Sequence, residues 1–227
     1  MEIPTQPKLF LINGETSTTA VELFPLVWQA AEKLVSKKEE TRSTALDELF
    51  SLNAPRVSPL VVYILATRLR DPSLSIRARV IEALANVLRA DVDGKLAPDQ
   101  VREYLVSFIT QLSKDDIYEI LVVGVREKEI KGHIAKLINY CPQAGKILTQ
   151  LVADRDISVE IRRISANFIG QIGFVEALPT LERLRNRLET RQTVQRGMPF
   201  APPISMDEST LLSDIQEAIS LLQISGM

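Results

Sequence analysis

The chain contains one histidine, His133, and one cysteine, Cys141, as candidates for nucleophilic catalysis. If both residues lay on one α-helix, their spacing of eight residues would separate them by about 12 Å. That is far beyond the distance at which a base can take a proton from a thiol. We therefore interpret the pair as a buried cysteine and a partly exposed histidine, with no catalytic role.

Other sequence patterns that carry chemistry are missing. The chain has no G-x-G-x-x-G or G-x-x-x-x-G-K-[ST] motif for a phosphate and no G-x-S-x-G turn for a nucleophilic serine. A single histidine also excludes most zinc and non-haem iron sites. We expect no catalytic, cofactor-binding or metal-binding residues, and we predict that the protein is not an enzyme and uses no cofactor.

Charge and composition restrict the partners. The 227 residues are 45% hydrophobic, and 27 basic against 29 acidic residues give a net charge of −2. Proteins that coat nucleic acid or anionic membranes usually carry a basic excess, so a nucleic-acid partner is disfavoured. The single cysteine suits a reducing compartment, and the sequence has neither a signal-peptide pattern nor an apolar run of about 20 residues. We expect a cytoplasmic protein that does not insert into membranes.

The spacing of apolar residues predicts an all-α fold. In residues 75–89, for example, Ile76, Val80, Leu84 and Leu88 recur every four residues, which is typical of one buried helix face. Pro, Gly and Asp residues divide the chain into short helices, and Gly170 and Gly173 are candidates for C-caps. The predicted helices are 20–36, 40–52, 57–70, 74–90, 98–113, 116–127, 129–140, 143–153, 157–171, 174–190 and 207–223.

Two of these helices begin with related sequences. The segment from Asp71 aligns without a gap to the segment from Asp156, so that Arg77 matches Arg162 at an offset of 85 residues. This offset equals two periods of about 42 residues, within the range of HEAT and armadillo repeats. A weaker copy places Arg42 in the position of Arg77.

The pattern at 71–88 and 154–188 resembles the HEAT-repeat (armadillo-type) family, whereas 36–53 matches it weakly and 98–150 only in helix length. The resemblance implies an α-α superhelix, a HEAT-like solenoid of about five helix pairs. The expected organisation is an N-terminal arm (1–19), a HEAT-like domain (20–190), a Pro-rich linker (191–206) and a C-terminal amphipathic helix (207–227).

Four residues at the starts of these repeats have an expected structural role. Asp71 and Asp156 are placed where an N-cap carboxylate would accept backbone N–H bonds. The resemblance implies that Arg77 and Arg162 form a ladder with such N-cap carboxylates of neighbouring repeats, so that Asp71, Arg77, Asp156 and Arg162 are its expected members.

The concave surface of such a solenoid usually binds proteins or peptides, so we expect a non-catalytic interaction scaffold. Its candidate partner-binding residues are Arg79, Glu82, Asn86, Arg163, Asn167 and Gln171. The alternative is a HEAT-like DNA-acting enzyme of the alkylpurine glycosylase type. The negative net charge opposes that alternative, as does Trp28, the one tryptophan, which we place in the core.

The two ends of the C-terminal region carry opposite charge. Arginines crowd residues 183–196, whereas residues 207–227 contain four acidic residues and no lysine or arginine. Ser205 and Glu208 have the spacing of a capping box, and Leu211, Ile215 and Leu222 form an apolar stripe. The linker then tethers an acidic helix that docks either on this chain's own last repeat or on another molecule.

Overall fold

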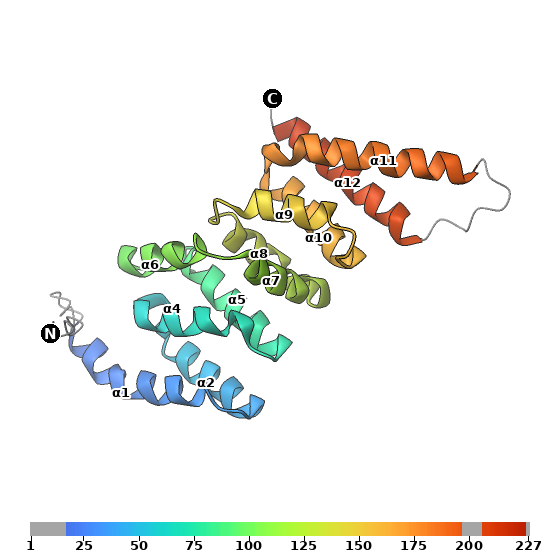
Figure 1. Cartoon of the computed structure of the whole chain (residues 1–227). Coiled ribbons are helices and arrows are strands. Elements are labelled where there is room, and N and C mark those ends of the chain that lie inside the picture. Colours follow the sequence, from blue (N-terminus) through green and yellow to red (C-terminus); the bar gives the residue numbers. More distant parts are fainter. Residues whose placement is uncertain (1–16, 197–205, 226–227) are drawn as a thin grey trace, which may run out of the picture. The chain divides into compact units, whose positions relative to one another are not determined.

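The protein is known from a computed structural model that describes residues 17–196 and 206–225. Throughout these two ranges the regular elements are helices, so the all-α prediction is confirmed. The α-helices are α1 (Ser17–Lys33), α2 (Glu39–Ser51), α3 (Ala54–Val57), α4 (Pro59–Ala66), α5 (Leu74–Val87), α6 (Asp99–Ile109), α7 (Lys114–Arg126), α8 (Lys131–Ile138), α9 (Ala144–Ala153), α10 (Val159–Ile172), α11 (Leu178–Arg196) and α12 (Met206–Ser225) (Figure 1). Short 3-10 helices lie at η1 (Thr67–Arg70), η2 (Lys128–Ile130) and η3 (Val175–Ala177).

The chain divides into two compact units, residues 1–52 and 53–227, where the sequence predicted one array over 20–190. The predicted helix 57–70 is also divided, because Ser58 has extended backbone angles and caps α4 by accepting from the Val61 N–H. The next four residues, Thr67–Arg70, tighten into the 3-10 helix η1.

In the first unit, α1 packs against α2. Ala30, Leu46 and Leu49 are buried, and the Lys33 ammonium lies 2.5 Å from the Glu48 carboxylate. The prediction that Trp28 lies in the core is wrong: its side chain is 53% exposed, and its indole N–H donates to Glu32. These two residues are four apart and therefore share one face of α1.

In the second unit, most helices pack on helices that are close to them in the sequence. Helix α4 contacts α6, α5 contacts α7 and α8, and α7 contacts α10. Helix α10 lies between α9 and α12, which flank it in Figure 1. The core of this unit is therefore made of apolar faces that successive helices bury against one another.

Two glycines, Gly170 and Gly173, lie near the end of helix α10 and have different roles. Gly173 adopts the left-handed conformation, with φ +89°, and its N–H donates to the Ile169 carbonyl. Gly170 is not a C-cap, contrary to prediction, but lies inside the helix. A Cβ atom there would come within 2.8 Å of the Ala218 Cα, so glycine lets the backbones of α10 and α12 approach closely.

Helix α12 buries the predicted apolar stripe. Leu211, Ile215, Ala218 and Leu222 are buried, and α12 contacts both α10 and α11. Docking on this chain's own helices is therefore confirmed, although α12 packs on α10 as well as on the predicted α11.

The boundaries of the flanking segments differ from prediction. Helix α11 continues through Arg196, so the first six residues of the predicted linker 191–206 are helical. The arm 1–19 overlaps α1 from Ser17 onward. Residues 1–16 and the linker residues 197–205 lie outside the described part, and with them Ser205 of the predicted capping box. None of the described helices combines the length and the apolar character that a bilayer crossing requires.

Candidate binding surface

One buried arginine recurs at the same position of three helices. The fourth residue of α2, α5 and α10 is Arg42, Arg77 and Arg162 respectively. Their exposed fractions are 5%, 7% and 8%, although arginine is seldom buried unless it is paired. In α7 the fourth residue is Ile117, which is also buried. The arginines that the sequence alignment matched thus occupy the same position in their helices, the fourth.

These arginines have different partners. Arg77 donates to the backbone carbonyl and the carboxylate of Glu119 on α7, which lies 42 residues further along the chain. Arg162 donates from Nε to the Val152 carbonyl, 3.0 Å away in the last turn of α9. Arg42 donates to the carbonyls of Ser36 and Lys37, just after α1. Arg77 thus contacts a carboxylate on a later helix, although Glu119 is not one of the N-cap aspartates expected in the ladder. Arg162 and Arg42 donate to backbone carbonyls.

The expected N-caps are wrong in both repeats. Ser73 caps α5 by accepting from the Ile76 N–H, and the buried Asp71 accepts from the Ser73 N–H at 2.9 Å. Ser158 occupies the cap position of α10 without a side-chain hydrogen bond. Asp156 is exposed on the loop before it. In each copy the cap position lies two residues after the aspartate, because a turn separates the aspartate from the helix.

A polar groove lies between the start of α5 and α7. It encloses about 470 Å³ and is lined by Arg70, Asp71, Pro72, Arg77, Asp115 and Glu119. Next to it, the Arg70 Nε lies 2.5 Å from the Asp116 carboxylate. Side chains of both charges therefore line this groove.

The start of α7, which forms one wall of the groove, is fixed by a capping box. The Ser113 hydroxyl accepts from the Asp116 N–H, and the Asp116 carboxylate accepts from the Ser113 N–H at 2.9 Å. Burial by itself raises the pKa of Asp116, but hydrogen bonds from Arg70 and Ser113 outweigh it, so the pKa is lowered from its ordinary value of 3.8. Asp116 is thereby held ionised.

A second groove lies on the other side of α7, against α10. It encloses about 370 Å³ and is lined by Tyr118, Val122, Val125, Arg126, Ser158, Glu160 and Ile161. The residues of α7 that line the two grooves recur at three- and four-residue steps, so they form one continuous helix face. We call this face, with the two grooves beside it, the α7 surface.

The six residues predicted to bind a partner lie elsewhere. None of them lines either groove. Glu82 and Gln171 are exposed, while Arg79, Asn86 and Asn167 are half-buried. Arg163 forms a 2.5 Å ion pair with Asp214, so α12 of the same chain contacts the α10 part of the predicted surface.

The α7 surface was missed because residues 98–150 match the repeat only in helix length. The helix itself was predicted, as 116–127, and two further signals could have placed its start and its buried face. Ser113 and Asp116 have capping-box spacing, and Ile117, Ile120, Leu121 and Gly124 repeat every three or four residues.

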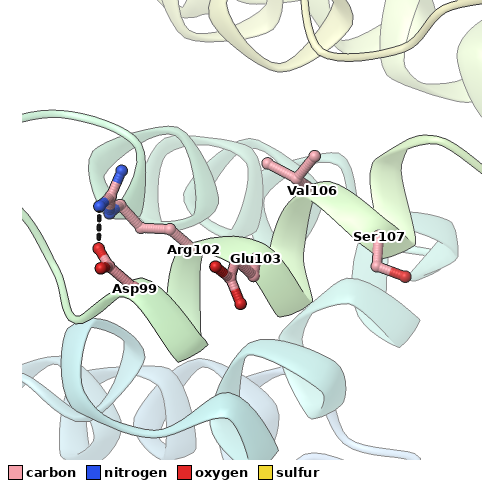
Figure 2. A pocket seen from close by; sticks show the side chains of 5 residues that line it. All are labelled: Asp99, Arg102, Glu103, Val106 and Ser107. Atoms are coloured by element: carbon pink, nitrogen blue, oxygen red, sulfur yellow. Dashed lines mark hydrogen bonds and ion pairs between the residues drawn. The ribbon is translucent and has the colours of Figure 1, made fainter.

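A third recess lies along α6. It encloses about 370 Å³, and Figure 2 shows its five lining residues on successive turns of that helix: Asp99, Arg102, Glu103, Val106 and Ser107. Arg102 forms an ion pair with Asp99, so two of the charges neutralise each other. This recess supplies a comparison for the α7 surface, because it is similar in volume and is lined from a single helix.

The residues first considered for catalysis lie apart from these grooves. Cys141 is a buried free thiol and His133 is half-buried, as predicted. Within residues 17–196 and 206–225, no three histidine, cysteine or acidic side chains are grouped closely enough to hold a metal ion.

Comparisons of the chain with protein-family models, curated proteins and solved structures found no match.

Proposed function

We propose that this protein is a non-catalytic scaffold that binds a protein or peptide partner on the α7 surface. The observation that carries the proposal is the pair of grooves on the two sides of one helix face. An extended or helical segment laid across α7 would contact both grooves at once, in the manner of helix- and peptide-binding surfaces. The side chains that line them combine apolar groups with fixed charges, as protein interfaces do.

A HEAT-like solenoid is the architecture that we propose for the chain. Its support is the buried arginine at the fourth position of α2, α5 and α10, together with the packing of helices that are close in the sequence in the second unit. Such arrays expose long surfaces on stacked helices, which suits a binding role. A buried free thiol at Cys141 also suits the reducing cytoplasm, where we expect the protein to work.

Charge on the α7 surface favours a protein partner over DNA. Asp115 and Glu119 lie beside Arg77 in the first groove, and Glu160 lies with Arg126 in the second. A DNA-acting enzyme needs a continuous basic trough to neutralise phosphates, whereas this surface carries both signs of charge. The glycosylase alternative therefore has no support from these grooves.

The test is affinity capture from native lysate with the full chain, followed by mass spectrometry, using two matched variants. Val122→Glu places a charge in the second groove of the α7 surface, and Val106→Glu makes the same change in the α6 recess. Both valines are half-buried. We expect one protein to be recovered in stoichiometric amount by the wild type and by Val106→Glu, and to be lost with Val122→Glu.

Two results would contradict the proposal. Recovery of nucleic acid without protein would favour the DNA-acting alternative. Equal recovery of the partner by both variants would place the binding site away from α7. Circular dichroism of each variant shows whether the chain is folded, so that a loss of binding is not a loss of structure.

A further inference from the structure

A recess with strongly positive walls lies between the end of α9 and the first half of α11. It encloses about 360 Å³ and is lined by Ala153, Thr180, Arg183, Leu184 and Arg187. Arg183 and Arg187 are four residues apart and therefore share one face of α11. The guanidinium of Arg183 is held in place, since it donates to the Pro179 carbonyl and the Thr180 hydroxyl, each at 3.2 Å.

Two further arginines add to the charge at this recess. Burial lowers the pKa of Arg187, and the nearby positive charges of Arg155 and Arg191 lower it further. Within the described residues, Arg155, Arg183 and Arg187 form no ion pair with a carboxylate. Positive charges are thus gathered at one place, and in the described part of the chain those of Arg155, Arg183 and Arg187 are not paired with a carboxylate.

Several acceptor groups near the cluster are bonded to other donors. Carbonyl groups in the last turn of α9 could attract arginines, but Val152 already accepts from Arg162 and Gln150 accepts from the Asp154 N–H. Asp214 of the acidic helix α12 pairs with Arg163 on α10 instead. The arginines of the recess are therefore available to a ligand.

We propose that the recess lined by Arg183 and Arg187 binds a phosphate group. Guanidinium groups are planar forks of N–H donors that match phosphate oxygens, and Thr180 supplies a hydroxyl within the same recess. Leu184 and Ala153 give the site an aliphatic wall, which can contact the carbon atoms that carry a phosphate.

The recess lined by Arg183 and Arg187 fits a single phosphate group better than a polyanion. Asp154 and Asp156 stand on either side of Arg155, and Glu182 and Glu189 lie on α11 among its arginines. A nucleic-acid strand or an anionic membrane would meet these carboxylates and be repelled. The phosphate could be free in solution or attached to a serine of a partner protein, and both sources present the same oxygens to the arginines.

The experiment is calorimetric titration of the full chain with inorganic phosphate at constant ionic strength, comparing Arg187→Gln with Arg185→Gln. Arg185 is the matched control, because it lies on the same helix but bonds to Asn186 and faces Glu189 at 3.9 Å. We expect Arg187→Gln to weaken phosphate binding about tenfold and Arg185→Gln to leave it within about twofold. A neutral peptide with one phosphoserine, and the same peptide without it, distinguish the two sources.

Tighter binding of the phosphopeptide than of phosphate would assign the site to a partner's phosphoserine, and equal binding would assign it to free phosphate. Equal affinities of the two variants for phosphate, or no binding by the wild type, would overturn the proposal. So would tighter binding of a duplex oligonucleotide that is reduced by Arg187→Gln. Thermal melting in chloride shows whether Arg187→Gln is folded, and Arg183→Gln provides a second test of the recess.

Discussion

Helices α5 and α10 begin with related sequences but have different surroundings. In α5, Asp71 is buried beside a groove, and Arg77 reaches forward to Glu119 on α7. In α10, Asp156 is exposed, and Arg162 reaches back to the Val152 carbonyl. The two copies therefore share the position and the burial of the arginine, whereas its contacts lie on a later helix in one copy and on the preceding helix in the other.

The outer faces of these helices differ in the same way. Helix α12 packs on α10, with Gly170 against Ala218 and Asp214 paired with Arg163. Beside α5, by contrast, the polar groove opens between its start and α7. A face that is covered by the chain itself can stabilise the fold, while a face with an open groove is available for binding.

The largest expected effect comes from the buried arginines. Arg162→Ala should lower the free energy of unfolding by about 3 kcal/mol, because it leaves a cavity and a buried carbonyl without its donor. Arg77→Ala should cost about 1.5 kcal/mol, since the Glu119 side chain is 42% exposed and can be hydrated when Arg77 is lost. Urea unfolding measures both, and equal losses would contradict the difference between α5 and α10.

The close approach of α10 and α12 is tested by two glycines. Gly170→Ala should destabilise the protein by about 1–3 kcal/mol, because the new methyl group meets the backbone of Ala218. Gly132→Ala, on α8, meets nothing within 4 Å and should stabilise by about 0.5–1 kcal/mol through helix propensity. Thermal melting of the two variants should shift in opposite directions, and shifts of the same sign would refute this packing.

The capping box of α7 gives a smaller effect. Ser113→Ala removes the side-chain acceptor of the Asp116 N–H and should cost about 1 kcal/mol. Ser158→Ala, at the cap position of α10 where no side-chain bond is made, should cost less. Chemical denaturation that finds the two substitutions equal would show that the box does not hold α7 in place.

The smallest effect concerns pH. Because the pKa of Asp116 is lower in the folded protein, its contribution is complete above the ordinary value of 3.8 and is lost as the pH falls through the folded value. Asp116→Asn should therefore reduce the loss of stability below pH 3.8, whereas Asp93→Asn, in an exposed loop, should not. Denaturation curves recorded across this acid range would contradict the account if both variants kept the wild-type slope.

The sequence was informative where local chemistry dominates. Helical periodicity located the buried faces of α5, α10 and α12, and the left-handed Gly173 followed from its position after an apolar run. The alignment of Arg42, Arg77 and Arg162 also predicted their common position in the helices. Each of these features depends on residues within a few turns of one another.

Features that depend on distant residues could not be read in this way. The docking of α12 on α10 requires Gly170 to meet Ala218, 48 residues away, and no spacing rule pairs those two positions. Trp28 was placed in the core on residue type alone, yet it lies on the exposed side of α1 beside Glu32. The α7 surface was missed because grooves arise from neighbouring helices, and Ile117 replaces the arginine that marks the other repeats.

The most direct test of the scaffold proposal is amide hydrogen exchange of the full chain with and without the captured partner. We predict slower exchange along α7 (Lys114–Arg126) and the first turn of α10, with unchanged exchange in α6. Slower exchange confined to α6 or α12, with α7 unaffected, would contradict the assignment of the binding surface.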